Sequence, residues 1–152
     1  MSGAKPAVTV RPIRPEDRAG WETLWQGYLR FYKEDLPQEV TDIVWTRLLD
    51  PAEPMRALVA EADGVLLGLV HCVFHRGTWS IGDVCYLEDL FTAEAARGRG
   101  VGRALIEAVY ELARQSGAVR VYWVTQEDNK TARALYDKLA ELQDFVQYRK
   151  LI

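Results

Sequence analysis

The spacing of apolar residues along the chain follows two patterns. In some segments apolar residues alternate with polar ones. In others several β-branched residues follow one another. Both patterns indicate strands. Elsewhere apolar residues recur every three or four positions, which indicates helices. The predicted strands cover residues 8–13, 56–61, 65–75, 84–91, 119–125 and 145–150. The predicted helices cover residues 15–32, 38–49, 101–116 and 131–139. Because strands and helices intermix, the order predicts a mixed sheet with helices on both faces.

The helix predicted over 101–116 has the clearest two-sided pattern. Its apolar face carries Leu105, Ala108, Val109, Leu112 and Ala113, and its polar face carries Arg103, Glu107, Glu111 and Arg114. Between residues 56–61 and 65–75, the run Ala62-Asp63-Gly64 predicts a tight hairpin turn. No linker long enough to divide the chain occurs. We therefore expect a disordered N-terminus over residues 1–7 and a single domain over residues 8–152.

A glycine-rich run lies between the strand ending at Phe91 and the helix beginning near Val101. It reads Arg97-Gly98-Arg99-Gly100-Val101-Gly102. Glycines at alternate positions let backbone N–H groups turn toward one point, and the start of a helix adds unpaired donors and a positive dipole end. Together with Arg97, Arg99 and Arg103, these donors predict a cradle for a phosphate or pyrophosphate.

Two common phosphate-binding motifs do not fit this run. A P-loop needs Gly-Lys-Ser/Thr after its first glycine, and the chain contains no such sequence. A dinucleotide fingerprint needs glycine or alanine where this chain has Leu105. The spacing Arg97-x-x-Gly100-x-Gly102 instead resembles the acetyl-coenzyme A signature of the GCN5-related N-acetyltransferases (GNAT).

Two further stretches carry the same resemblance. Asn129-x-x-Ala132-x-x-x-Tyr136-x-Lys138 is similar to the family's second motif. Glu88-Asp89-Leu90-Phe91 resembles its central strand, most closely in members that acetylate polyamines and lysine-like amines. The family commonly follows its tyrosine with Gly-Phe, whereas this chain reaches Phe145 without a glycine.

The resemblance implies an α/β (α+β) fold with a mixed, mostly antiparallel central sheet flanked by helices on both faces. It implies transfer of an acetyl group from the cosubstrate acetyl-coenzyme A (acetyl-CoA) to a primary amine of a polyamine, a lysine-like amino acid or a protein. It also implies that the backbone near Leu90 and Thr92 holds the cofactor arm and the acetyl oxygen. The cofactor-binding residues would be Leu90, Phe91, Thr92, Arg97, Gly98, Arg99, Gly100, Val101, Gly102, Arg103, Asn129 and Tyr136.

Acetyl transfer to an amine needs a base for the ammonium and an acid for the departing thiolate. Tyr136, by its place in the second motif, is the predicted acid. Glu88 is the predicted base or amine anchor, acting directly or through a water, because a carboxylate within an apolar strand is costly unless it lines a cleft or is paired. Strict alternation would place Glu88 with Tyr86 and Leu90, and Asp89 on the opposite face. Either carboxylate alternatively caps a loop or pairs with an arginine.

Acidic residues also gather where the first two helices meet. Glu34, Asp35, Glu39 and Asp42 lie there, and the family usually builds its acceptor site at this junction. Glu34, Asp35 and Asp42 together with Glu88 are the predicted substrate-binding residues for a polycationic amine. The alternative is an ordinary solvated helix end.

Composition narrows the classes of protein to which this chain could belong. The 152 residues carry a formal net charge of −3, which argues against nucleic acid as the main partner. Two cysteines and two histidines have no zinc-site spacing, and no apolar run could span a membrane. We expect a cytoplasmic enzyme without a metal, and a homodimer. A non-catalytic acyl-CoA-binding or sensing module is the alternative, although it would need neither Glu88 nor Tyr136.

Overall fold

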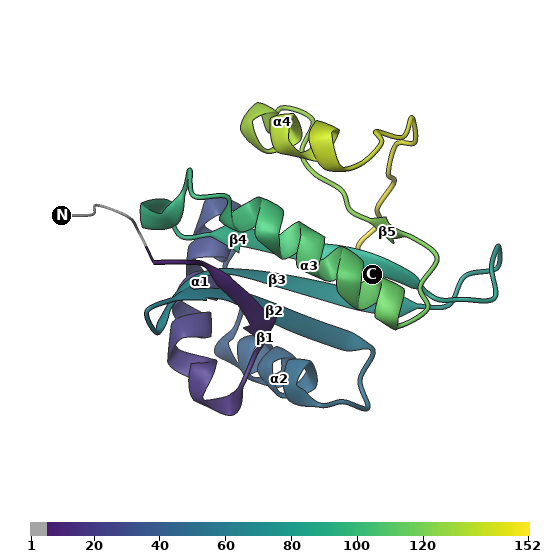
Figure 1. Cartoon of the computed structure of the whole chain (residues 1–152). Helices are drawn as coiled ribbons and strands as arrows, with labels where there is room; N and C mark the ends of the chain where they lie inside the picture. The colour runs from purple at the N-terminus through teal and green to yellow at the C-terminus, as the bar shows by residue number, and fades with distance from the viewer. Residues whose placement is uncertain (1–5) are drawn as a thin grey trace.

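A computed structural model describes residues 6–152 of the chain (Figure 1). Residues 1–5, most of the predicted disordered N-terminus, lie outside the described residues. The strands are β1 (Thr9–Pro12), β2 (Met55–Ala62), β3 (Val65–His75), β4 (Val84–Thr92) and β5 (Val121–Tyr122). The α-helices are α1 (Arg18–Phe31), α2 (Gln38–Leu49), α3 (Val101–Gln115) and α4 (Lys130–Leu139). Two single turns of 3-10 helix, η1 (Pro15–Asp17) and η2 (Glu94–Ala96), precede α1 and α3.

The five strands form one sheet in the order β1-β2-β3-β4-β5. The first three neighbouring pairs are antiparallel and the last, β4 with β5, is parallel, which confirms the mixed, mostly antiparallel sheet. The predicted hairpin between β2 and β3 is also confirmed. Its turn places Asp63 at φ 50° and Gly64 at φ 74°, the two left-handed positions that a type I′ turn requires.

Helices cover both faces of the sheet, as predicted (Figure 1). On one face α1 and α2 bury a cluster with strands β2 and β3, centred on Trp21, Trp45, Val59 and Leu69. On the other face α3 buries a larger cluster against β2, β3 and β4. Its fully enclosed members include Val70, Cys72, Cys85, Val101, Leu105, Ile106 and Val109.

Gly68 of β3 sets how closely the start of α3 approaches the sheet. A Cβ at this position would lie 2.8 Å from the carbonyl oxygen of Phe91 and 2.9 Å from Cγ1 of Val101. Both contacts are closer than side chains tolerate, so only glycine lets β4 and the first turn of α3 pack here without a shift.

A β-bulge interrupts the alternation of β4. His71 pairs with Asp89 and the next residue, Cys72, pairs with Leu87, so Glu88 is the extra residue. The predicted alternation is therefore wrong on either side of Glu88. Leu90 packs on the α3 face together with Cys85, whereas Asp89 turns to the α1 face, where its carboxylate meets His71.

The C-terminal part of the sheet is shorter than predicted. The strand expected over residues 119–125 is reduced to the two residues of β5. The strand expected over residues 145–150 is wrong: residues 140–152 form neither helix nor strand, and each of them is exposed. A strand needs a partner for its backbone groups, and the rest of the described chain places none beside this segment.

The remaining boundaries agree closely with the prediction. The helix expected over 38–49 is α2 itself, and the helix expected over 15–32 is η1 followed by α1. Asp17, the last residue of η1, caps the start of this turn, because its carboxylate accepts a hydrogen bond from the Arg14 N–H, and it accepts another from the Arg11 guanidinium. Among residues 6–152, no helix has both the length and the apolar character needed to cross a membrane.

Candidate active site

The glycine-rich loop between η2 and α3 has the geometry of an anion cradle. Gly98 and Gly100 adopt positive φ angles of 81° and 75°, and no atom lies within 4 Å of where their Cβ atoms would be. The N–H groups of residues 98–103 donate no hydrogen bond to the rest of the described chain. A row of unpaired donors at the N-terminus of a 15-residue helix attracts a phosphate group.

The arginines around this loop differ in how they are held. Arg103 Nε donates to Glu107 Oε1 at 2.8 Å, and Arg99 Nη2 donates to the carbonyl oxygen of Pro6 at 3.1 Å. Arg97 is exposed at the end of η2. All three place positive charge near the open N–H groups, so the residues present suit the pyrophosphate and ribose phosphate of coenzyme A.

The edge of β4 opens toward this loop. β5 pairs with β4 only at Cys85–Val121 and Tyr86–Tyr122, and beyond Tyr86 the edge has no strand partner in the described chain. Ala93 donates its N–H to Leu67 across to β3. Since backbone groups point alternately to the two sides of a strand, those of Leu90 and Thr92 point to the open edge. An extended, amide-containing ligand therefore has backbone partners there.

The middle of α4 borders the same opening, through Leu135. A Cβ on Gly102 would lie 3.5 Å from Leu135 Cδ2 and 3.9 Å from Thr92 Oγ1, so the loop, the end of β4 and α4 converge. Asn129 is the N-cap of α4, and its Nδ2 donates to Thr125 Oγ1 at 3.3 Å. This convergence brings the two predicted cofactor motifs together.

Tyr136 lies on α4, half-buried, with its ring edge against Trp123 at a centroid distance of 5.4 Å. Burial raises the pKa of Tyr136, and the neighbouring phenol of Tyr32 raises it further. Tyr32 follows the last residue of α1, so Tyr136 lies near the C-terminal end of that helix. The phenol stays protonated at neutral pH and is available as a proton donor.

Glu88 occupies the bulge, and its side chain reaches solvent. The protein around its carboxyl nevertheless removes part of its hydration. This desolvation, followed by the negative charge of Asp89, raises the pKa of Glu88, and His71 opposes the rise. A carboxylate with a raised pKa is better suited to accept a proton near neutral pH than an ordinary glutamate.

Sequence reasoning missed a buried chain of polar groups behind the bulge. Trp21 Nε1–H donates to His71 Nε2 at 2.9 Å, and His71 Nδ1 lies 2.9 Å from Asp89 Oδ2. Indole is only a donor, so Nε2 of a neutral His71 must accept and Nδ1 must carry the hydrogen that Asp89 receives. The available signal was a histidine inside an otherwise apolar strand, flanked by Val70 and Cys72.

Asp89 lies near two tyrosines, Tyr28 in α1 and Tyr32 just after it. Burial and then the charge of Asp89 raise the pKa of Tyr28 and that of Tyr32. The two rings contact each other at a centroid distance of 5.0 Å. Asp89, Tyr28 and Tyr32 thus form one wall of the candidate site, and the effect of Tyr32 on the pKa of Tyr136 places α4 near this wall.

The other predicted acidic residues are not all brought to this wall. Asp42 accepts hydrogen bonds from Arg18 and Gln38, near the N-terminal end of α1. At ~1.5 Å per residue, Arg18 and Tyr28 are about 15 Å apart along that helix. Glu34 and Asp35 are exposed in the connection after α1, and Glu39 is exposed on the first turn of α2. Of the predicted acceptor residues, Glu88 directly precedes Asp89, whereas Asp42 is held by Arg18 and Gln38.

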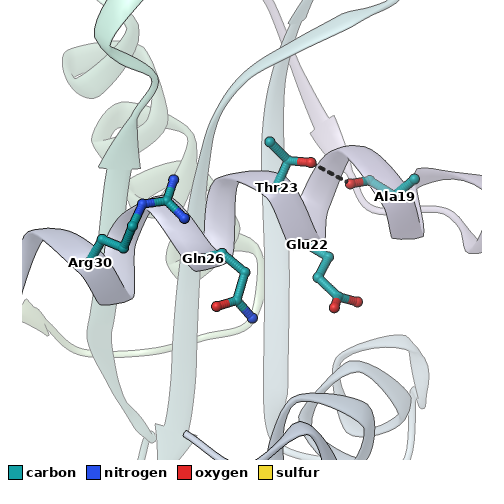
Figure 2. Close-up of a pocket in the computed structure, with 5 residues that line it drawn as sticks. All are labelled: Ala19, Glu22, Thr23, Gln26 and Arg30. Carbon is teal, nitrogen blue, oxygen red and sulfur yellow. Dashed lines mark hydrogen bonds between the residues drawn. The ribbon is translucent and has the colours of Figure 1, made fainter. Parts of the chain in front are cut away.

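The solvent-facing side of α1 has a shallow depression of its own. Ala19, Glu22, Thr23, Gln26 and Arg30 line it (Figure 2). The Thr23 hydroxyl donates back to the Ala19 carbonyl at 3.0 Å within the helix. None of these side chains belongs to the loop, the β4 edge or α4, so this depression is separate from the candidate site.

Comparisons with known proteins identify the family. The family profile of the acetyltransferase (GNAT) family matches residues 21–140. A D-amino-acid N-acetyltransferase of Saccharomyces cerevisiae is 37% identical over 145 residues, covering 94% of this chain and 90% of the relative. A thialysine N-epsilon-acetyltransferase of Caenorhabditis elegans is 38% identical over 73 residues, covering 48% of this chain and 42% of the relative.

A solved structure shares the fold. An aminoglycoside N-acetyltransferase in complex with CoA superposes with a TM-score of 0.82 at 21% identity, covering 99% of both chains. The profile match spans most of the chain, and the yeast relative is similar over nearly its whole length. The chain therefore belongs to the GNAT family of N-acetyltransferases.

Proposed function

We propose that this protein transfers the acetyl group of acetyl-CoA to the primary amine of a small, positively charged acceptor, an amino acid or a polyamine. The observation that carries the proposal is the open edge of β4, which has the glycine-rich loop and Tyr136 on one side and Glu88 and Asp89 on the other. The names of the yeast and nematode relatives support an amino acid acceptor.

Each chemical task has a residue suited to it. Acetyl-CoA supplies the activated thioester when bound. Glu88 takes the proton of the acceptor ammonium, directly or through a water, and Asp89 holds the amine as its counter-charge. The N–H of Leu90 at the open edge donates to the acetyl oxygen, and Tyr136 donates a proton to the departing sulfur. The indole and imidazole of Trp21 and His71 hold Asp89 in place.

The domain, the oligomeric state and the location of the protein are also part of the proposal. We propose that residues 8–152 form the catalytic domain and that the protein works as a homodimer in the cytoplasm. Cys72 and Cys85 are free and buried, which is consistent with a reducing compartment. Glu34 and Asp35 remain proposed contacts for the far end of a longer amine, whereas Asp42 is already engaged by Arg18.

The acceptor class is tested by an amine panel. Purified protein with acetyl-CoA is offered D-lysine, L-lysine, spermidine and a neutral aryl amine, and release of the CoA thiol is measured. We expect turnover with at least one charged aliphatic amine and none with the aryl amine. Tight binding of acetyl-CoA without thiol release for any amine would instead identify a non-catalytic acyl-CoA-binding module.

Gly100→Ala should weaken acetyl-CoA binding by about tenfold or more, because it adds a methyl group where the ligand lies and perturbs the N–H cradle. Gly117→Ala is the matched control: Gly117 has the same φ of 75° and equally open surroundings at the other end of α3. Both variants carry a backbone strain of ~1–2 kcal/mol. Calorimetric titration should separate them, and an equal loss of affinity in both would contradict the cradle.

Tyr136→Phe should lower kcat by ~10²–10⁴-fold, the usual range for a lost general acid, while the Kd for acetyl-CoA changes little. Tyr110→Phe provides the control, since it also removes one hydroxyl, which donates to the Leu139 carbonyl at the end of α4. Steady-state rates and binding titrations distinguish the two. A Tyr136→Phe enzyme with undiminished kcat, under conditions where chemistry limits turnover, would assign Tyr136 a packing role only.

The pH dependence distinguishes Glu88 from Asp89. A base acts only when deprotonated, and the pKa of Glu88 is raised, so the activity of the wild-type enzyme should fall as pH is lowered through that pKa. Glu88→Gln should lower kcat and remove this acidic limb. Asp89→Asn should instead raise KM for the amine more than it lowers kcat. It should keep the acidic limb but move it to lower pH, because the charge of Asp89 no longer raises the pKa of Glu88. The reverse assignment of these two effects would make Asp89 the base.

A further inference from the structure

A histidine in the core, His71, has both ring nitrogens engaged, although the proposed chemistry gives it no proton to move. It lies on β3 and is 3% exposed. Its Nε2 accepts the indole N–H of Trp21, and its Nδ1–H donates to Oδ2 of Asp89, each at 2.9 Å. Because an indole nitrogen is only a donor, the two hydrogen bonds can run in one direction only, from Trp21 to Asp89.

The indole N–H of Trp21 opposes protonation of His71. An imidazolium carries a hydrogen on both nitrogens, so a proton on Nε2 would point at the indole N–H from 2.9 Å, with two donors facing each other. Close packing keeps the Trp21 side chain in place: it is 0% exposed, and its ring lies 6.0 Å from that of Trp25 and 4.8 Å from that of Trp45, centroid to centroid. His71 is therefore held in its neutral form.

The other titratable groups near Asp89 are a second carboxyl and three phenols. Glu88 and Tyr86 lie near it on β4, and Tyr28 and Tyr32 lie in the last turn of α1 and just after it. Burial raises the pKa of all four, and the negative charge of Asp89 raises it further. None of these groups brings a positive charge to Asp89.

The elements behind the imidazole add no free cation either. β2 places Ala57 opposite His71. At the start of α1, the guanidinium of Arg18 lies 5.9 Å from the centroid of the Trp21 ring. This guanidinium is already bound by two carboxylates, those of Glu22 and Asp42.

Asp89 consequently bears its negative charge without a cation beside it. Among residues 6–152, its ion-pair partner within 4 Å is the imidazole of His71 alone, and its side chain is 13% exposed. A mostly enclosed carboxylate is costly unless an opposite charge or several hydrogen bonds compensate it. An ammonium group brought to Asp89 would supply that compensation.

We propose that Trp21 and His71 are positioning residues that keep Asp89 charged and unpaired for the acceptor. The indole N–H prevents protonation of His71, so the ammonium of the acceptor, and not the imidazole, becomes the cation that pairs with Asp89. A protonated His71 would neutralise Asp89 inside the protein and would repel the ammonium. The role of Asp89 toward the amine rests on the proposed function, whereas the protonation state of His71 does not.

The first test measures the protonation state of His71 in the wild-type protein, by NMR of the nitrogen-labelled imidazole rings between about pH 6 and pH 8. The chain has two histidines, and His75→Gln identifies the signals of His71. We expect the neutral form with its hydrogen on Nδ1 over the whole range. An imidazolium in this range, or a hydrogen on Nε2 in the neutral form, would overturn the proposal whether or not the enzyme acetylates any amine.

The second test removes the indole N–H with Trp21→Phe and compares KM for the amine with that of the wild type at each pH. The ratio of the two KM values should rise about fourfold or more from pH 8 to pH 6, because a histidine that titrates near pH ~6.5 leaves about a quarter of the protein neutral at pH 6. Trp45→Phe is the matched control, since it truncates a second buried tryptophan of the same cluster while the bond from Trp21 to His71 remains. Its ratio should not change with pH.

A double variant attributes the effect to the imidazole. Trp21→Phe combined with His71→Asn places an amide beside Asp89, and an amide takes up no proton in this range, so the KM ratio should no longer depend on pH. Circular dichroism checks that each variant is folded, and the wild-type NMR spectra decide the state of His71 without any core variant.

A KM ratio for Trp21→Phe that stays constant, that matches the ratio for Trp45→Phe, or whose pH dependence persists in the double variant would overturn the proposal. Absence of turnover by the wild-type enzyme with every amine of the panel would contradict the proposed function and with it the role of Asp89 toward the amine. The NMR spectra decide the protonation state of His71 independently of that result.

Discussion

The unequal pairing of β4 is the constraint on which the rest of this structure depends. Along one edge every residue of β4 except Glu88 pairs with β3, and along the other β4 meets β5 at only two positions. A backbone edge inside a protein normally has its N–H and C=O groups satisfied by a neighbouring strand. Here the bonded edge makes β4 rigid, and the free edge leaves Leu90 and Thr92 able to bind an extended ligand without any rearrangement of the sheet.

The bulge at Glu88 places two successive carboxylates of this strand in different surroundings. Because one extra residue reverses the alternation, successive carboxylates come to differ in environment: Glu88 reaches solvent, whereas Asp89 is held from behind by His71 and Trp21. The positive charges lie beyond Thr92, around the start of α3. Along a few residues of the strand, a region suited to a cation, at Glu88 and Asp89, is therefore followed by a region suited to an anion, beyond Thr92. We expect the reacting atoms between these two regions.

Much of the fold could be predicted from the sequence because local signals agreed with tertiary packing. The I′ turn at Asp63-Gly64, the amphipathic pattern of α3 and the glycine run before it each determine their own conformation. The bulge could not be predicted, since it depends on which residues of β3 lie opposite β4. The link between Trp21, His71 and Asp89 joins three distant positions and has no local pattern. The strand expected over 145–150 fails for a similar reason: a strand-like sequence does not specify its partner.

The absence of a side chain at Gly68 has a consequence for how variation in this protein should be interpreted. Gly68 lies on β3, apart from the glycine-rich loop, yet it sets the depth at which Val101 and the carbonyl of Phe91 are seated. The position of the glycine-rich loop thus depends on how closely the start of α3 packs against the sheet at Gly68. A change at Gly68 would displace the helix start as a unit, so a natural or engineered substitution there would resemble a defect in ligand affinity although it touches no ligand.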